Sequence, residues 1–206
     1  TYWRSPGDVG LPPRWTWKNI ENIHGITVNW PKPEFMRIFD MDTYIYHDEV
    51  ILPIEVKITD EQKVTSLALG LEYMICEEIC VPQEGSYRLD ISSLENIKIL
   101  PFQKAQLDRY RELVPLKKSS DNVRVKLDGD QGNMVMIKLS EDFINVSHII
   151  VEGPDSILFE QAFTNDNGYF QVRYRGKRSA LEGQEITLTL LLKGGGAHEM
   201  TVTVQR

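Results

Sequence analysis

The chain has 206 residues, of which 41% are hydrophobic and 26% are charged, and its formal net charge is −7. This composition is typical of a globular protein and excludes a collagenous or mostly disordered chain. Because the negative charge repels a phosphate backbone, we expect no nucleic-acid partner. The longest apolar stretch, residues 186–192, is far shorter than the roughly 20 residues that a membrane-spanning helix needs.

The first half of the chain predicts β-structure. Stretches rich in β-branched residues and bounded by Pro, Gly or Asp are typical of strands. Such stretches occur at residues 26–30, 50–58, 64–73 and 87–91. All four tryptophans lie within the first thirty residues, and we expect Trp3, Trp15 and Trp17 to build the core and its edge.

A single helix is predicted between Pro101 and Pro115. Leu107, Tyr110 and Leu113 recur every three residues, as on one face of a helix over residues 103–113. The polar segment 116–121 that follows is typical of a linker. We therefore predict a domain boundary near Ser119, with a first domain of residues 1–118 and a second domain of residues 119–206.

The second half alternates apolar and polar residues more regularly than the first. Short strands separated by glycine-containing turns are typical of a β-sandwich. The strands are predicted at residues 123–127, 134–139, 169–174, 186–192 and 200–204. The whole chain is therefore predicted to be all-β, with two β-sandwich domains joined by a short helical linker.

Cys76 and Cys80 are the only cysteines in the sequence. A disulfide between them closes a five-residue loop and stabilises the fold by about 2 kcal/mol, against about 4.7 kcal/mol for a loop of a hundred residues. Zinc usually takes four ligands, and the histidines show no paired spacing. The pair is therefore a redox couple, a short structural bridge, a soft-metal site or two buried thiols, and spacing alone does not choose among these.

Two glutamates, Glu77 and Glu78, stand between the cysteines. Nearby carboxylates raise the pKa of a thiol unless a cation such as Arg37 or Lys63 lies close. Such a pair suits exchange within a docked complex better than fast reaction with any thiol. The simpler interpretation of the glutamates is a solvated turn.

Several motifs together resemble the N-terminal periplasmic domain of DsbD-type reductases, and most of all its ScsB branch. The resemblance follows the chain in order from residue 1 to about residue 115, and it is weaker over residues 120–206. The segments that carry it are Tyr-Trp-Arg-Ser-Pro-Gly-Asp-Val-Gly-Leu-Pro-Pro at residues 2–13, Val-Asn-Trp-Pro-Lys-Pro at 28–33, residues 44–53, and Cys-Glu-Glu-Ile-Cys-Val-Pro at 76–82.

This resemblance implies an electron relay. In the family, a membrane-embedded domain passes reducing equivalents to an immunoglobulin-like periplasmic domain, which reduces thioredoxin-fold partners. The expected fold class is then all-β, with two immunoglobulin-like β-sandwich domains joined by a short helical linker. The expected partners are a periplasmic thioredoxin-fold protein, ScsC-like or DsbC-like, and the transmembrane domain of the same full-length protein. The chain would be a soluble periplasmic domain of an inner-membrane protein, with no cofactor.

The resemblance also implies the site residues. Cys76 and Cys80 match the cysteines that cycle between dithiol and disulfide, with Cys80 forming the mixed disulfide and Cys76 resolving it. DsbD spaces its own pair more widely. The family's cap loop matches residues 37–41, where Phe39 would shield the disulfide together with Asp40 and Met41.

Tyr2 matches an aromatic position near the family's active site. The simpler interpretation of both Tyr2 and Phe39 is that they are packing residues.

Two alternative functions stay open from the sequence. The first is a non-catalytic β-sandwich binding module with a structural disulfide. The second is a periplasmic copper-binding domain, because thioether and thiolate sulfurs are soft ligands and Met36, Met41 and Met74 are close to the site segments in sequence.

Overall fold

The computed structural model describes residues 1–92, 98–128, 132–143, 145–164 and 169–205. The chain divides into two compact units. The first unit contains residues 1–37 and 43–114, and the second contains residues 38–42 and 115–206. The boundary near Ser119, with domains of residues 1–118 and 119–206, stays a prediction.

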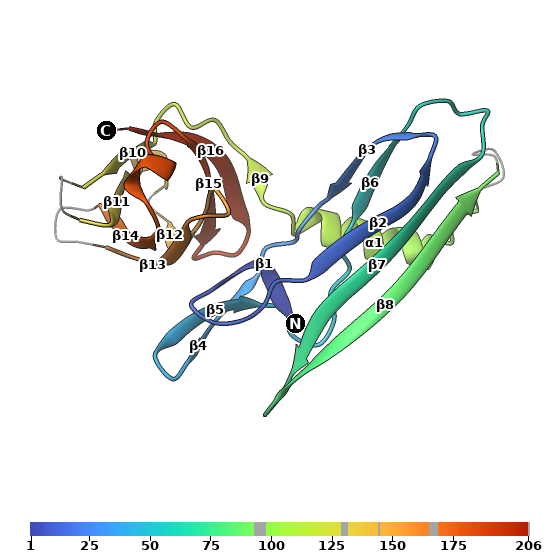
Figure 1. Ribbon diagram of the computed structural model, residues 1–206, viewed down its shortest axis with the longest axis horizontal. Coiled ribbons are helices and arrows are strands. Elements are labelled where there is room, and N and C mark those ends of the chain that lie inside the picture. Colours follow the sequence, from blue (N-terminus) through green and yellow to red (C-terminus); the bar gives the residue numbers. More distant parts are fainter. Residues whose placement is uncertain (93–97, 129–131, 144, 165–168, 206) are drawn as a thin grey trace. The chain divides into compact units, whose positions relative to one another are not determined.

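The strands within residues 1–91 form three small sheets (Figure 1). The first sheet has the order β1-β5-β4, the second β2-β7-β8, and the third pairs β3 with β6. Their bounds are β1 (Tyr2–Gly7), β2 (Arg14–Glu21), β3 (Ile23–Val28), β4 (Glu34–Ile38), β5 (Met41–Ile45), β6 (Ile54–Ile58), β7 (Thr65–Cys76) and β8 (Cys80–Ile91). The long strands β7 and β8 form an antiparallel hairpin whose turn lies at the cysteine pair.

Aromatic side chains build the centre of the first unit. Trp3 is fully buried, and its indole N–H donates a hydrogen bond to the carbonyl of Pro31 at 3.2 Å. The Tyr46 hydroxyl donates to the same carbonyl at 2.7 Å. Burial raises the pKa of Tyr46 above its ordinary value, so this hydroxyl stays protonated and remains a donor. Strand β1 is thereby anchored to the segment that follows β3.

Helix α1 (Pro101–Glu112) follows these strands and confirms the helix predicted from the three-residue spacing. Proline is tolerated at its first position because the first N–H groups of a helix have no partner within it. Tyr110 is the buried residue of α1, and its hydroxyl donates to the backbone carbonyl of Glu49 at 3.1 Å. The N–H of Lys32 also donates to Leu113 O at 2.7 Å, so both ends of this contact lie within the first unit.

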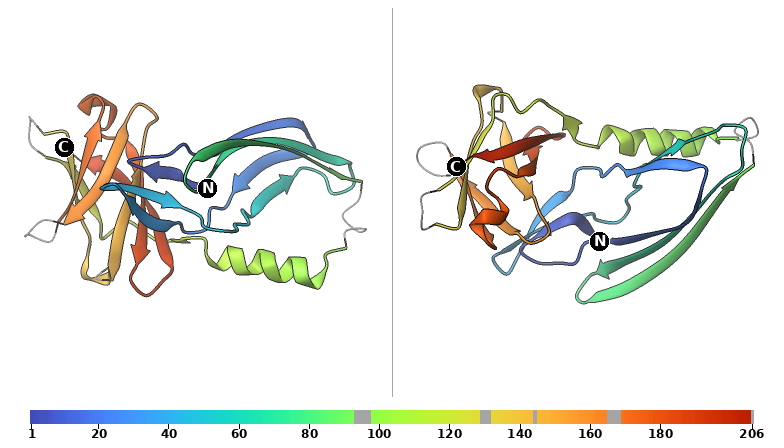
Figure 2. Two further views of the ribbon diagram at one scale, coloured as in Figure 1. Left: turned by 90° about the horizontal axis from the view of Figure 1, so that it is seen from below. Right: turned by 45° about the horizontal axis from the view of Figure 1, so that its top comes forward.

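The second unit is a strongly curved sheet around an aliphatic core (Figure 2). Its strands follow the order β12-β15-β16-β10-β11-β14-β13, with β9 also paired to β16, and β12 and β13 at the two ends of this path lie beside each other. The bounds are β9 (Leu116–Lys117), β10 (Arg124–Leu127), β11 (Met134–Lys138), β12 (Val146–Glu152), β13 (Leu158–Thr164), β14 (Phe170–Arg175), β15 (Glu185–Leu192) and β16 (Ala197–Gln205), with 3₁₀ turns at Glu141–Phe143 and Arg178–Ala180.

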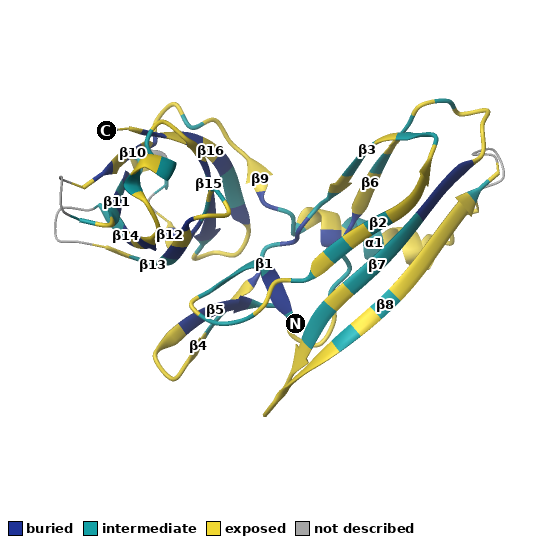
Figure 3. Ribbon diagram, viewed as in Figure 1, coloured by how far each residue is buried: buried dark blue, intermediate teal, exposed yellow. Residues whose placement is uncertain are grey.

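Alternation places the apolar residues of the second unit inside. Val125, Val135, Ile137, Leu188 and Leu190 are fully buried, while the residues between them on β10 and β11 are more exposed (Figure 3). A strand turns successive side chains to opposite faces, so one face of β10 and one face of β11 fill the core.

The prediction of an all-β chain with a short helix between two β-domains is confirmed. Several strand predictions are wrong in their bounds, and the largest difference is at β8, which begins at Cys80 and not at residue 87. Strand β6 begins only at Ile54, because Pro53 precedes it, and β3 ends at Val28, before the prolines at 31 and 33. Strands β1, β2, β4, β5, β9, β12 and β13 were not predicted.

Candidate functional site

The cysteine pair lies at the turn of the β7–β8 hairpin. The register runs without interruption from Thr65 opposite Ile91 to Cys76 opposite Cys80. Residues directly opposite in an antiparallel pair alternate between a wide and a narrow separation of their Cα atoms. The Cα atoms of the two cysteines are 4.0 Å apart, a narrow pair, and the two sulfurs form a disulfide. A spacing of four therefore places the sulfurs within bonding distance through hairpin register.

The disulfide is open to solvent. Both cysteines and both glutamates of the turn are exposed, and Ile79 between them is 75% exposed. Figure 3 shows the turn end of the hairpin in the exposed colour. Both cysteine residues are therefore accessible from solvent.

Tyr2 is held against this disulfide. Its hydroxyl lies 3.4 Å from Cys80 Sγ and donates a hydrogen bond to that sulfur, which carries no hydrogen in the disulfide. Strand β1 places the residue, since Tyr2 is in register with Ile45 of β5. The ring packs on Gly10, where an added Cβ would lie 2.4 Å from the ring and where φ is +122°. The structure therefore brings Tyr2 and Cys80 together, as the resemblance implied.

Phe39 and Asp40 form the turn between β4 and β5. Both have positive φ, +48° and +62°, which is the geometry of the two central residues of a tight hairpin turn. Phe39 is 92% exposed, and Met41 is also exposed. The shielding role of Phe39, Asp40 and Met41 stays a prediction.

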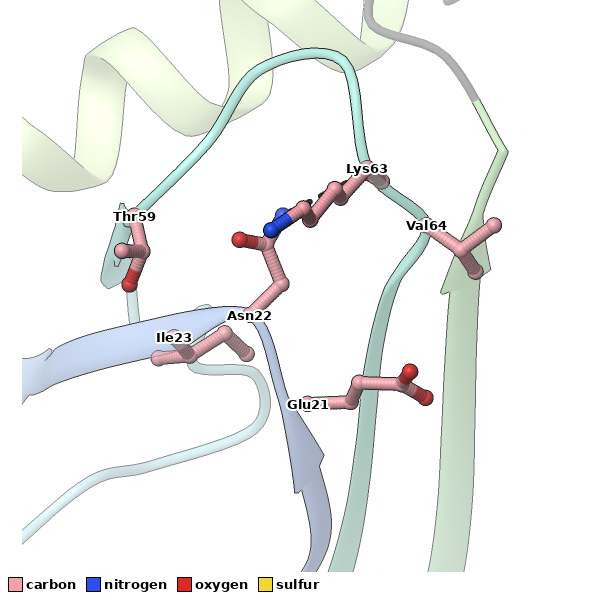
Figure 4. Close-up of a pocket in the computed structure, with 6 residues that line it drawn as sticks. All are labelled: Glu21, Asn22, Ile23, Thr59, Lys63 and Val64. Carbon is pink, nitrogen blue, oxygen red and sulfur yellow. Dashed lines mark hydrogen bonds between the residues drawn. The ribbon is translucent and has the colours of Figure 1, made fainter.

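One of the two cations considered for the cysteines, Lys63, lies away from them. Lys63 pairs with Asp60 at 3.6 Å. Lys63 lines a pocket with Asn22 and Thr59 (Figure 4). It lies two residues before β7, whereas Cys76 is the last residue of that twelve-residue strand. Arg37 lies over the ring of Phe35, 5.9 Å from its centre. Lys63 is thus at the opposite end of β7 from the disulfide.

The metal alternative gains no ligand set. Among the described residues, no group of three or more His, Cys, Asp or Glu side chains could hold a metal ion. Both cysteine sulfurs are used in the disulfide, and Met74 lies opposite Pro82 in the hairpin.

In the part of the chain that the structure describes, no helix is long and apolar enough to cross a membrane.

Comparison with known families finds a match for residues 1–91. Residues 1–91 match the family model described as "Thiol:disulfide interchange protein DsbD, N-terminal". This segment of the chain is similar to the DsbD N-terminal family. The match covers β1 to β8, and therefore includes Tyr2, the β4–β5 turn and both cysteines.

The comparison with solved structures extends over the whole chain. The chain is similar to the N-terminal periplasmic domain of ScsB from Proteus mirabilis, with a TM-score of 0.75 and 19% identity, covering 100% of this chain and 82% of the other. At this identity the likeness shows the fold, and it includes the second unit that the DsbD family model does not cover. No curated protein matches the chain.

The sequence analysis missed a pair of carboxylates near the disulfide. Glu72 on β7 and Glu84 on β8 are directly opposite each other in the hairpin. The signal was present, because each glutamate stands four residues outside a cysteine. Once Cys76 is set opposite Cys80, counting outward along both strands pairs the two glutamates.

Proposed function

We propose that this chain is a periplasmic thiol-disulfide relay domain whose Cys76–Cys80 pair cycles between dithiol and disulfide. The observation that carries this function is an exposed disulfide at the turn of a hairpin within a segment similar to the DsbD N-terminal family. A structural staple gains little from closing so short a loop, whereas exchange requires exposed sulfur. We propose further that the domain belongs to an inner-membrane protein whose membrane-embedded part reduces it.

In the proposed reaction, Cys80 is the attacking sulfur and Cys76 is the resolving sulfur. The Cys80 thiolate attacks a disulfide sulfur of the partner, forms a mixed disulfide and releases one partner thiolate. The Cys76 thiolate then attacks Cys80 Sγ, closes the Cys76–Cys80 disulfide and releases the second partner thiolate. Two electrons pass to the partner, which takes up two protons as its dithiol forms, while the relay domain is oxidised. In the disulfide form, the hairpin register places Cys76 opposite Cys80.

This function is tested by direct transfer to a thioredoxin-fold protein. The reduced chain is mixed with oxidised DsbC, and the thiols of both proteins are counted by alkylation and mass shift. We expect thiols to disappear from this chain as they appear on DsbC. A chain that lacks both cysteines is the control, and no transfer from the intact chain to DsbC or to a ScsC-type protein would contradict the proposal.

Tyr2 is proposed to assist Cys80. A hydroxyl that donates to sulfur stabilises the thiolate more than the disulfide, because hydrogen bonds to charged groups are the stronger ones. Tyr2→Phe should slow mixed-disulfide formation through Cys80 roughly fivefold, as measured by quenched alkylation. The matched control is Tyr73→Phe, since Tyr73 is on the other face of β7 from Cys76. Equal rates for the two variants would remove this role.

Phe39 is proposed as a shield for the disulfide. An exchange-active disulfide in an oxidising compartment benefits from protection against small thiols until a partner docks. Phe39→Ala should then speed reduction of the disulfide by glutathione severalfold in stopped-flow measurements. Phe102→Ala is the matched control, because Phe102 is also an exposed phenylalanine. An unchanged rate would remove the shield and leave the relay intact.

A further inference from the structure

We infer that the free edge of β8 binds an extended segment of the redox partner as an added antiparallel strand, with a partner Lys or Arg opposite Glu84. This inference rests on the proposed relay and names how the partner is recognised. The cysteine that is proposed to react lies at the start of this edge, since Cys80 is the first residue of β8.

Strand β8 ends its sheet. In the part of the chain that the structure describes, β8 pairs along its whole length with β7, and the sheet order is β2-β7-β8 (Figures 1 and 2). Its twelve residues are mostly exposed. A long exposed edge strand presents unpaired N–H and C=O groups, which are a template for pairing with another chain.

The hairpin register identifies which backbone groups point outward. A narrow pair such as Cys76 and Cys80 is the kind that exchanges no hydrogen bonds with its opposite residue. The even-numbered residues of β8 therefore direct their N–H and C=O groups away from β7. Pro82 fits this assignment, because proline has no N–H and is found at strand positions where the N–H faces solvent. Cys80 and Glu84 thus direct their backbone N–H and C=O groups outward from the edge. Their side chains lie on the same face of β8.

The charge at the edge specifies the partner's side chain. Glu72 and Glu84 are opposite each other, and like charges in this arrangement are unfavourable. Arg14 of β2 pairs with Glu72 at 3.8 Å, and within the described residues no ion pair reaches Glu84. A pocket of about 280 Å³ lies beside Glu72 and Glu84, and it is lined in part by Leu11, Pro12 and Pro82. The outer side of Glu84 is therefore suited to a cation from the partner.

The other face of β8 is apolar at the same edge. Val81, Tyr87 and Leu89 are exposed there, with Tyr87 at 56%. In a strand that pairs antiparallel to β8, the residue opposite Glu84 precedes the residue opposite Cys80 by four positions. The partner segment therefore has Lys or Arg four residues before its reacting cysteine, and apolar residues at the alternate positions.

The test uses the full chain with Cys76→Ser and synthetic peptides whose cysteine is activated as a mixed disulfide with thionitrobenzoate. The Cys80 thiolate attacks the peptide sulfur and displaces coloured thionitrobenzoate, so the rate is read by absorbance. Two peptides differ only in Lys or Glu four residues before the cysteine. We expect the Lys peptide to react about fivefold faster. Glu84→Gln should abolish this preference, whereas Glu78→Gln, which removes a charge in the turn, should preserve it.

Strand pairing is tested separately by N-methylation of the peptide. Methylating the N–H opposite Glu84 should slow the reaction roughly fivefold, because that N–H donates to β8, while methylating the next residue toward the cysteine should not. Equal rates for the Lys and Glu peptides, or for the two methylated peptides, would overturn the inference. Sedimentation that shows β8-dependent dimers would also overturn it, because a second copy would then occupy the edge.

Reaction with the small disulfide dithionitrobenzoate separates this inference from the proposed function. A Cys80 thiol that reacts with this reagent but does not distinguish the peptides leaves the relay intact and removes only strand recognition. A Cys80 thiol that fails to react with the small reagent removes the relay itself.

Discussion

Cys76→Ser and Cys80→Ser are each expected to abolish catalytic turnover of disulfide exchange. Each replacement leaves one sulfur, which can form a mixed disulfide but cannot complete the cycle. Because the native disulfide closes only a five-residue loop, its loss costs about 2 kcal/mol, and the fold should survive in both variants. Circular dichroism checks the fold. The activity is measured as the appearance of thiols on oxidised DsbC.

The two variants should differ in what they trap. Cys76→Ser keeps Cys80, which has the Tyr2 hydroxyl at 3.4 Å, and should accumulate a mixed disulfide with the partner that mass spectrometry detects. Cys80→Ser should trap far less. The opposite result, with trapping through Cys76, would exchange the two roles. Full turnover by both single variants would refute the relay.

Trp3→Ala is expected to cost the first unit about 3–5 kcal/mol of unfolding free energy, the usual range for a fully buried tryptophan. The substitution empties the centre of this unit and removes one of two hydrogen bonds to Pro31 O. It should also loosen Tyr2, the preceding residue of β1. We therefore expect slower exchange through Cys80 as well as lower stability.

Urea unfolding followed by tryptophan fluorescence measures this effect. All four tryptophans lie in the first unit, so the signal reports that unit even with Trp3 removed. Tyr46→Phe is the companion variant, because it removes only the other hydrogen bond to Pro31 O and should cost about 1–3 kcal/mol. A cost below about 1 kcal/mol for Trp3→Ala would contradict the assignment of Trp3 as the anchor.

Patterns of side chains predicted much of the fold. Strand β10 of the second unit was found because Val125 and Leu127 alternate with Arg124 and Lys126, and β11 because its run of apolar residues is bounded by turns; Val125, Leu127, Val135 and Ile137 fill one core. The helix was found because its signals are local. A three-residue period of apolar residues and flanking prolines can be read from the sequence without knowledge of tertiary contacts. Strand β2 was missed although Trp15 and Trp17 alternate within it, because the enrichment in β-branched residues was given more weight than a period of two.

Other elements depend on contacts that one-dimensional patterns do not contain. Strand β1 includes Pro6 and ends at Gly7, both unfavourable in strands, and it is held by β5 and by the bonds of Trp3 and Tyr46 to Pro31. The distance between Tyr2 and Cys80 likewise results from tertiary packing across 78 residues. The resemblance to a family pointed to Tyr2, but only the structure shows which sulfur its hydroxyl meets.

The Glu72–Glu84 pair shows where more could have been inferred. Hairpin register follows from the cysteine pair alone, and the register places the two carboxylates opposite each other. The free edge of β8 could not be inferred in this way, because the order of strands in the sheet depends on β2, which pairs with β7 and leaves β8 outside.

The reduction potential of the Cys76–Cys80 pair tests the relay most directly. The full chain is equilibrated in glutathione or dithiothreitol buffers, and the oxidised fraction is read by mass shift after alkylation. A relay domain should have a potential between about −180 and −270 mV, the range of exchange-active proteins. A potential below about −300 mV would instead identify a structural disulfide and contradict the relay.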